Sequence, residues 1–447
     1  MKEFATSIVQ TLRQHGFQAY LVGGCVRDLL LHRAPKDYDV ATNATPHQVM
    51  EIFPETYAVG AQFGVVLVPA PSAEASASPD SSHGVTVEVA TFRSDIGYTD
   101  GRHPDEVRFA QDPRQDVARR DFTINGMLLD PVSGEVLDFV GGRADLEAGI
   151  IRAIGDPELR FAEDKLRMLR AVRFAARFEY QIDSATFCAM QKLAAEIEVV
   201  SCDRVRDELT RMLTEGHAPR AFRLLDESGL LGHVLPEISI MKGVQQPPEF
   251  HPEGDVFVHT LMLLENLPHP CPATLAWGAL LHDVGKPATF RVAPDRIRFD
   301  NHVEVGVRIA EEICRRLRFS SDDTEQILSL VDNHMRFGQA TRMSASTLKR
   351  FFRLPSFDDH LALHRADCLA SHRGLATYEF VRQKRAEIPP QEIRPAPLVT
   401  GDDLIAAGHR PGPKFREILD AVEDAQLEGR LASRNAALEF VHREFPA

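Results

Sequence analysis

The sequence is poor in the cysteine patterns that mark exported and zinc-binding proteins. Its six cysteines form no CxxC pair, because they lie at positions 25, 188, 202, 271, 314 and 368. Scattered cysteines favour a reducing compartment and argue against a zinc site built from thiolates. We therefore expect a cytoplasmic protein.

Long apolar runs are also missing. No stretch reaches the roughly 18 consecutive apolar residues of a membrane-spanning helix. The first segment, MKEFATSIVQTLRQHGF, predicts an amphipathic helix and lacks the small-residue cleavage site of a signal peptide. We expect no membrane association. The length of 447 residues favours two to four domains with a large buried core.

Positive charge is in deficit, with 51 Lys and Arg against 65 Asp and Glu and a formal net charge of −14. Taken alone, this balance argues against a nucleic-acid partner, whose binding usually needs a basic surface. Screening, however, limits each charge to a reach of roughly 10 Å at ordinary salt, so distribution matters more than the sum. Residues 160–177, RFAEDKLRMLRAVRFAAR, contain six basic and two acidic side chains. The sequence therefore predicts a local basic face on an acidic protein.

Strand signals are concentrated in about the first 140 residues. AYLVGG, YDVAT, GVVLVPA, VTVEVATF and VLDF are rich in β-branched or alternating apolar residues and predict strands. TPHQVMEIF predicts a helix capped by Thr45 and begun by Pro46. The Ser-, Ala- and Pro-rich stretch 69–84 predicts a disordered insertion between two strands.

From about residue 145 onward, helical periodicity dominates, including the stretch ELRFAEDKLRMLRAVRFAARF. Pro-rich connections at 245–255 and 388–401 predict domain boundaries. The predicted fold class is α+β, with a small mixed sheet followed by mostly helical domains. We expect four domains, at 1–143, 144–248, 249–388 and 389–447.

The stretch LVGGCVRDLLLHRAPKDYDV, residues 21–40, has a glycine turn after a strand. It is not a dinucleotide fingerprint, because Gly23 and Gly24 are adjacent and a third glycine is missing. Alternation along a strand would place Asp37 and Asp39 on one face, where they could hold two Mg²⁺ ions. The alternative is a solvated turn with two incidental aspartates.

Four further residues complete this hypothesis. The two glycines would let backbone amides approach a triphosphate, and Arg27 would add positive charge. A third acid is expected on a neighbouring strand, and Glu88 in VEVATFR is the candidate.

A second motif is RRDFTIN, residues 119–125. Arg119 or Arg120 could bind a phosphate through the fork of its guanidinium, and Asn125 could cap a turn or contact a ribose. The alternative is a dibasic helix entry.

The third motif is EDKLR, residues 163–167. On one continuous helix, Asp164 and Arg167 would share a face, either as an ordinary salt bridge or as a reader of base edges. Cytosine and adenine each present an amine donor beside a ring-nitrogen acceptor, which an Asp acceptor and an Arg donor satisfy. Guanine and uracil present a ring N–H and a carbonyl instead, so unpaired groups would cost about 1–3 kcal/mol each.

Taken together, these segments resemble the class II tRNA nucleotidyltransferases, the family of CCA-adding enzymes and bacterial poly(A) polymerases within the DNA polymerase beta superfamily. The motifs occur in the order and approximate spacing of that family, and the resemblance covers about residues 18–235. It implies a nucleotidyltransferase head at 1–143 and a helical neck and body at 144–248. The implied metal ligands are Asp37 and Asp39. The implied nucleotide-binding residues are Gly24, Arg27, Arg119, Asp164, Arg167, Arg170 and Arg173, with Asp164 and Arg167 acting as an amino-acid template for the base.

Two segments separate members of that family. Poly(A) polymerases usually carry a basic stretch where this chain has VGAQFGVVLV, residues 59–68, so that activity is disfavoured. Enzymes that add only two cytidines typically have a shortened loop where this chain has the full-length 92–109. An enzyme that adds only the terminal A stays open.

Histidines and aspartates recur in the second helical block. His259 precedes the doublet His282-Asp283, and Asp367 lies about 80 residues further on. Imidazoles with carboxylates suit Mn²⁺, Ni²⁺, Fe or Zn²⁺ with an open water position. The block resembles an HD phosphohydrolase domain, which implies these four residues as metal ligands, while His302 and His334 would permit a second metal.

The block leaves its own alternatives open. An active site would hydrolyse phosphodiesters such as 2′,3′-cyclic phosphates, whereas an inactive one would serve as a tRNA-binding scaffold. Lys286 would help to bind phosphate or be a surface lysine. In the last segment, RPGPKFREIL at 410–419 looks like the C-terminal helices that anchor tRNA in bacterial CCA-adding enzymes.

The sequence thus predicts CCA addition to tRNA from CTP and ATP, with recognition of the acceptor arm and no protein partner. A poly(A) polymerase or A-adding enzyme is one alternative, and an HD hydrolase with an inactive polymerase domain is another.

Overall fold

The computed structural model describes residues 1–58, 63–70, 86–96, 106–247, 254–294 and 296–446. The chain forms two compact units, Met1–Pro236 and Glu237–Ala447, and each is described by itself. The four-domain division is finer than these two units and stays a prediction. The insertion 69–84, the loop 92–109 and the stretch 59–68 lie partly or largely outside the described residues.

A six-stranded sheet organises the first unit, in the order β3-β4-β2-β1-β7-β8. Its strands are β1 (Ala19–Val22), β2 (Asp39–Thr42), β3 (Val65–Pro69), β4 (Thr86–Thr91), β7 (Met127–Leu129) and β8 (Val136–Asp138). β2 and β4 are parallel, whereas the other neighbouring pairs are antiparallel. The predicted mixed sheet is confirmed, although β7 was missed.

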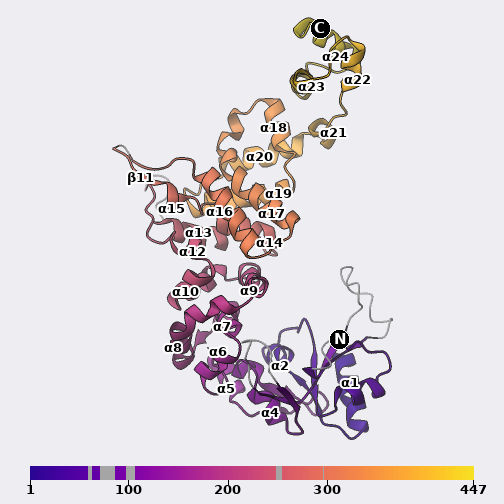
Figure 1. The fold of residues 1–447 in the computed structure, drawn as a ribbon, viewed down its shortest axis with the longest axis vertical. Helices are drawn as coiled ribbons and strands as arrows, with labels where there is room; N and C mark the ends of the chain where they lie inside the picture. Colours follow the sequence, from indigo (N-terminus) through magenta and orange to yellow (C-terminus); the bar gives the residue numbers. More distant parts are fainter. Residues whose placement is uncertain (59–62, 71–85, 97–105, 248–253, 295, 447) are drawn as a thin grey trace. The chain divides into compact units, whose positions relative to one another are not determined.

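Short helices surround this sheet. α1 (Lys2–Gln14) buries Ile8, Val9 and Leu12 and packs beside β1 and β2, as its predicted amphipathic pattern requires (Figure 1). α2 (Gly24–Leu30) follows the glycine turn directly. α3 (Pro46–Ile52) begins with the predicted Thr45 cap, which forms a capping box with Gln48.

Smaller elements complete this part of the unit. β5 (Arg93–Ile96) pairs with β6 (Glu106–Phe109), and β9 (Ile150–Ile151) pairs with β10 (Gln181–Ile182). Two further helices are α4 (Pro113–Ala118) and α5 (Gly142–Ala148), and the short 3₁₀ helix η2 spans Thr123–Asn125.

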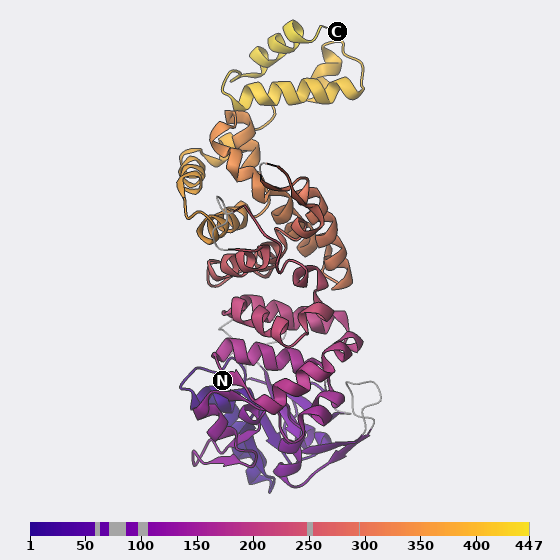
Figure 2. The same ribbon diagram turned by 90° about the vertical axis from the view of Figure 1, so that its left-hand side faces the viewer.

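The remainder of the first unit is helical, as predicted. Its helices are α6 (Pro157–Glu163), α7 (Leu166–Phe178), α8 (Ser184–Leu193), η3 (Ala194–Val199), α9 (Cys202–Thr214), α10 (Ala218–Glu227) and α11 (Leu231–Val234). α7 packs against α9 and α10, and these magenta helices lie next to one another in both views (Figure 2).

One helix prediction was wrong. Residues 158–178 do not form one continuous helix, because α6 ends at Glu163 and α7 begins at Leu166. Asp164 lies between them in an extended conformation, with φ −146° and ψ 105°. Its carboxylate accepts a hydrogen bond at 3.1 Å from the backbone N–H of Leu166, the first residue of α7.

The second unit is almost entirely helical. After α12 (Pro236–Ser239), at the junction of the units, its first helices are α13 (Val256–Glu265), α14 (Ala273–Leu281), α15 (Lys286–Thr289), α16 (His302–Arg316), α17 (Ser321–Asn333) and η4 (His334–Arg342). A hairpin of β11 (Phe290–Val292) and β12 (Ile297–Phe299) separates α15 from α16. α14 is apolar on all sides and buries the single tryptophan, Trp277.

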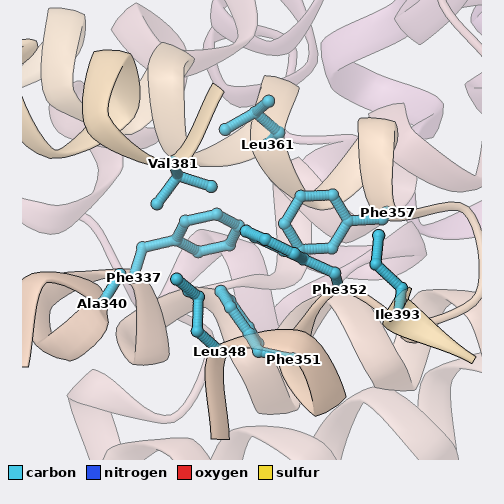
Figure 3. Close-up of a cluster of buried hydrophobic side chains, with 9 residues drawn as sticks. All are labelled: Phe337, Ala340, Leu348, Phe351, Phe352, Phe357, Leu361, Val381 and Ile393. Carbon is cyan, nitrogen blue, oxygen red and sulfur yellow. The ribbon is translucent and has the colours of Figure 1, made fainter. Parts of the chain in front are cut away.

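The rest of this unit contains two hydrophobic clusters. The helices are α18 (Ala345–Phe351), α19 (Phe357–Ala370), α20 (Ala376–Glu387), α21 (Pro390–Ile393), α22 (Gly401–Ala406), α23 (Pro413–Leu427) and α24 (Arg434–Glu444). One cluster is rich in phenylalanine, with Phe337, Phe351, Phe352 and Phe357 packed edge to face or tilted (Figure 3). The other joins α22, α23 and α24.

Candidate functional site

Two acids lie side by side on the central strands of the sheet. Asp39 begins β2, and its register partner on the parallel strand β4 is Glu88. Residues paired in this way project from the same face of a sheet. Asp37 lies two residues before β2 and not in the strand, so the predicted strand alternation does not place it. It nevertheless lines the same cavity of about 320 Å³ as Asp39.

These carboxylates repel one another. Burial and the neighbouring charges of Glu88 and Asp37 raise the pKa of Asp39 to about 6, although Arg120 opposes the shift. Loss of hydration also raises the pKa of Glu88, against the opposing effect of Arg120 and Arg119. A cluster whose ionised form is disfavoured gains from a bound cation, and hard divalent ions prefer carboxylate oxygens. The residues present therefore fit Mg²⁺.

The glycine turn keeps the space beside Asp39 clear. Gly23 has φ +76°, a conformation that favours glycine. A Cβ atom there would lie 3.4 Å from the Arg120 guanidinium and 3.7 Å from Oδ2 of Asp39. Both distances are ordinary van der Waals contacts, so glycine is favoured at this position by its positive φ.

A second cavity, of about 480 Å³, adjoins these residues and is strongly cationic. Among the described residues, nine arginines and three aspartates line it. Nine residues predicted from sequence lie here: Gly23, Gly24, Arg27, Asp39, Arg119, Asp164, Arg167, Arg170 and Arg173. Sequence reasoning did not assign Asp121, Arg177, Arg204 and Arg211 to the site, and it left Arg120 as an alternative to Arg119.

Buried carboxylates hold these arginines in place. Asp116 is fully buried, and each of its oxygens accepts two hydrogen bonds from one guanidinium, at 2.7 and 2.9 Å from Arg119 and at 2.9 and 3.2 Å from Arg120. Burial alone would raise the pKa of Asp116, but the two arginines outweigh it and lower that pKa. Both guanidiniums are thereby fixed before any ligand binds.

A hydrogen-bonded chain links α2 to α7. Arg27 donates to Oδ1 of Asn125 at 2.7 Å, and Asn125 donates to Asp121 at 3.1 Å. Asp121 accepts two hydrogen bonds from Arg170, at 2.6 and 2.9 Å. Asn125 therefore bridges two charged residues and does not simply cap a turn. Arg173 is held in the same manner by Glu208 on α9, at 2.6 Å.

Asp164 reaches the cavity from the break between the helices and Arg167 from the first turn of α7, so they do not share one helical face. Arg167 donates to Glu163 at 2.7 Å, to the Arg160 carbonyl at 3.0 Å and to the Arg119 carbonyl at 3.0 Å. Asp164 accepts from Arg204 at 2.8 Å. The two side chains are each held by other residues and both line the cavity.

The second unit contains a cluster of imidazoles and carboxylates. Two groups of three have ligand atoms within 4.8 Å of one another, namely His259, His282 and Asp367, and Asp283, His302 and His334. All six residues predicted from sequence are thus brought together. Five helices or their ends supply them, which explains their wide separation in the chain.

The histidine rings are oriented by backbone carbonyls. Nδ1 of His282, His302 and His334 lies 2.7 to 2.9 Å from the carbonyl oxygen three residues earlier. Their Nε2 atoms are buried, and those of His302 and His334 make no hydrogen bond with any described residue. An Nδ1–H donated to a carbonyl leaves the Nε2 lone pair available as a metal ligand. The donor set fits a divalent transition metal.

Asp283 lies between the two groups. Its Oδ2 is 3.0 Å from Nε2 of His282, and its Oδ1 is 3.8 Å from Nε2 of His302 and of His334. Burial would raise the pKa of Asp283, but His282 and Lys286 outweigh burial and hold it well below its usual range. Burial lowers the pKa of His334 to about 4, which keeps its ring neutral.

A cavity of about 410 Å³ opens onto this cluster. Lys286, Arg296 and Arg298 line it together with three aspartates, Asp283, Asp300 and Asp367, so its lining carries both signs of charge. Lys286 is not a surface lysine, because it is 7% exposed. Its ammonium donates to Gln246 at 2.6 Å and lies 2.7 Å from Oδ2 of Asp283.

Three known families match consecutive parts of the chain. The Poly A polymerase head domain matches residues 19–152. The family described as "Probable RNA and SrmB- binding site of polymerase A" matches residues 179–241. The HD domain family matches residues 256–371. These matches confirm the predicted polymerase beta-like head and the HD domain.

Whole-chain relatives agree with these matches. The CCA-adding enzyme of Limosilactobacillus reuteri is 40% identical over 437 residues, which cover 98% of this chain and 95% of the relative. That of Geobacillus sp. is 30% identical over 451 residues, covering 98% and 96%. Among solved structures, the Bacillus stearothermophilus CCA-adding enzyme in complex with CTP matches with a TM-score of 0.73 and 28% identity, covering 98% of this chain and 97% of that one. Among the described residues, no helix is both long and apolar enough to cross a membrane.

Proposed function

The chain belongs to the CCA-adding enzymes, and on that premise we propose that it builds or repairs the 3′-terminal CCA of tRNA from CTP and ATP without a nucleic-acid template. The observation that carries the proposal is the cationic cavity of the first unit. Asp39, Asp164 and Arg167 all line it. A nucleoside triphosphate needs groups of these kinds for its metal, its phosphates and its base.

We assign the catalytic acids as Asp37, Asp39 and Glu88, which would hold Mg²⁺. Divalent ions at such a site activate an attacking hydroxyl and stabilise a leaving pyrophosphate. Gly23 and Gly24 leave room for the triphosphate, while Arg27, Arg119 and Arg120 supply donors for its oxygens. Because Asp116 already fixes Arg119 and Arg120, little reorganisation is needed when the phosphates arrive.

Asp164 and Arg167 would read the base. The carboxylate of Asp164 accepts from the exocyclic amine of cytosine or adenine, and the guanidinium of Arg167 donates to the adjacent ring nitrogen. Guanine and uracil reverse this order of donor and acceptor, so binding them would leave buried groups unpaired, at about 1–3 kcal/mol each. Arg170 and Arg173 extend the positive lining along α7.

The remaining domains support this reaction in the proposal. Residues 1–143 form the head, 144–248 the neck and body, 249–388 the HD domain and 389–447 a tail that anchors tRNA. The acceptor arm of tRNA is A-form, so recognition would rest on shape and phosphates. A cytoplasmic location is part of the same proposal. It was predicted from the scattered cysteines, and all six are free thiols.

One experiment tests the reaction directly. Purified protein is incubated with tRNA ending at the discriminator base and with CTP, ATP or both. We expect two added residues with CTP and three with both nucleotides. Addition of A alone, or of a long A tract, would assign the protein to the A-adding or poly(A) alternatives. No addition at all would overturn the proposal.

The histidine cluster favours a second activity, metal-dependent hydrolysis of phosphodiesters at RNA ends. We propose His259, His282, Asp283 and Asp367 as ligands of a Mn²⁺, Ni²⁺, Fe or Zn²⁺ ion, with His302 and His334 available to a second. Lys286, Arg296 and Arg298 would bind the phosphate. RNA ending in a 2′,3′-cyclic phosphate, offered with each metal in turn, tests the activity. Metal binding without hydrolysis would leave this domain a scaffold.

A further inference from the structure

The carboxylate of Asp164 has two partners from different helices. Its Oδ1 accepts from the Leu166 backbone N–H at 3.1 Å, and its Oδ2 accepts from Nη2 of Arg204 at 2.8 Å. The side chains of Asp164 and Arg204 are 17% and 21% exposed, and both line the cationic cavity. The Arg204 contact spans 40 residues of sequence and joins the α6–α7 break to α9.

α9 is itself fixed to α7. Glu208, one turn after Arg204, accepts from Arg173 at 2.6 Å, and both side chains are about 95% buried. Glu215, just after α9, lies 3.7 Å from Arg173 and 3.5 Å from Arg177. Arg204 therefore comes from a helix whose position relative to α7 is already set.

Asp164 needs such support because of its place in the chain. It lies between two helices, in extended backbone, where the ladder of helical hydrogen bonds is interrupted. The Leu166 bond constrains one oxygen only. A second bond to the other oxygen fixes the plane of the carboxylate and hence the direction of its remaining lone pairs. A carboxylate has about four acceptor sites, so two are still available to a ligand.

We propose that Arg204 is a positioning residue that sets the base selectivity of the enzyme by orienting Asp164 toward the amine of cytosine or adenine. The inference rests on the proposed reading of the base by Asp164 and Arg167. Arg204 acts through Asp164, so its loss should weaken discrimination between bases more than it weakens binding of the triphosphate.

A rival role for Arg204 is direct contact with a phosphate of the nucleotide or RNA. The two roles differ in what they predict. A phosphate is common to all four nucleotides, so losing a phosphate contact would raise KM for all of them alike. Losing the orientation of Asp164 would penalise CTP and ATP while sparing UTP and GTP.

The test uses Arg204→Gln in the full-length protein, with tRNA acceptors that receive a single nucleotide. The measured quantity is kcat/KM for CTP divided by that for UTP, and likewise for ATP and GTP. We expect both ratios to fall roughly tenfold or more, the range of a hydrogen bond to a charged partner. Arg204→Lys, which keeps one donor and the charge, should recover part of the ratio.

Arg206→Gln is the matched control, because Arg206 lies on the same helix, pairs with Asp207 at 2.8 Å and does not line the cavity. Its ratios should stay at the wild-type value. Melting temperatures of the variants check folding, and CTP and UTP dissociation constants give a readout independent of turnover. If Arg204→Gln does not fold, Arg204→Lys is used to test the proposal. We expect this variant to lower the same two ratios, but by less.

An equal loss for all four nucleotides, or unchanged ratios, overturns the inference. Asp164→Ala, measured in parallel, separates the role of Arg204 from the template role of Asp164. If that variant relaxes selectivity and Arg204→Gln does not, the role of Arg204 is wrong and the template stands. If neither changes the ratios while CCA is still added, the template proposal itself fails.

Discussion

The two units present opposite kinds of polar atoms to a ligand, hydrogen-bond donors in the first and lone pairs in the second. In both units, hydrogen bonds from neighbouring groups hold those atoms in place. In the first unit, buried carboxylates such as Asp116 and Asp121 hold arginine donors toward a cavity. In the second unit, backbone carbonyls hold imidazole Nδ1 atoms, so that the Nε2 acceptors of His282, His302 and His334 face one another. In each site the groups that would face a ligand are held in place by other groups of the protein.

The two arrangements differ in which polar atoms they leave available to a ligand. Guanidiniums present N–H donors and a fixed positive charge, which suit phosphates and a base edge. Neutral imidazoles with carboxylates present lone pairs, which suit a metal ion. The protein therefore has one site built mainly for anions, with a small acidic cluster beside it, and one site built for cations with a basic rim.

The largest effect is expected when one acid of the first unit is removed, a change that leaves the second unit untouched. Asp39→Ala should lower nucleotide addition by roughly 10³-fold, because it deletes a ligand of the metal that stabilises charge in the transition state. Incorporation of labelled CTP into tRNA measures the loss. Metal content of the histidine cluster should be unchanged in this variant. Normal CTP incorporation would contradict the assignment of Asp39.

The reciprocal change is His282→Ala. We expect the affinity of the second unit for Mn²⁺ or Ni²⁺ to fall at least roughly 100-fold, because a ligand is lost directly. Calorimetric titration with each metal measures the change, and CCA addition to tRNA should be unaffected. A variant that keeps full metal affinity would show that His282 is not a ligand of the bound metal.

A smaller effect is that the two units should lose stability over different pH ranges. Burial lowers the pKa values of His360 and His364 to about 4, from 6.5 in the unfolded chain. Neutral rings thus stabilise the second unit fully above about pH 6.5, and this contribution, roughly 3 kcal/mol per histidine, is lost as the pH falls toward 4. In the first unit, burial is outweighed by Arg170 and Asn125, and the pKa of Asp121 falls to about 2. That contribution is present above about pH 4 and is lost only as the pH falls toward 2.

Trp277 reports on the second unit alone, because it is the single tryptophan. With a chelator present, we expect its fluorescence to show unfolding at a higher pH than circular dichroism shows for the remaining structure. His364→Gln should move the fluorescence transition to lower pH. Coincident transitions below pH 4 would contradict this order.

Much of the fold could be predicted because its signals are local. The strands around Asp39 and Glu88 follow from β-branched runs, and the start of α3 follows from Thr45 and Pro46. The break at Asp164 was missed because good helix formers lie on both sides of it. An Asp side chain can accept a hydrogen bond from a nearby backbone N–H in competition with the helix, and this tendency could have indicated the break.

The sequence predicted the residues of the candidate site but not the residues that hold them in place. The histidines, the acids and the arginines of α7 stand in recognisable patterns. Arg204 and Glu208 do not, because each acts across a contact between elements, whereas Asp116 lies only three and four residues before Arg119 and Arg120. Arg204 and Asp164 are 40 residues apart, and Arg173 and Glu208 are 35 apart. Local spacing carries no information about such pairs.

The parallel pairing of β2 with β4 has a consequence for the order of assembly. β1 pairs antiparallel with β2 and β3 pairs antiparallel with β4, so Asp39 and Glu88 belong to different antiparallel pairs. Contacts between distant segments form later than local ones, because the loop between them must first be closed. The acids therefore meet only when the two pairs dock side by side. A nascent chain cannot pair Asp39 with Glu88 until β4, which ends at Thr91, has emerged and folded, and any fluctuation that separates β2 from β4 would part these two acids.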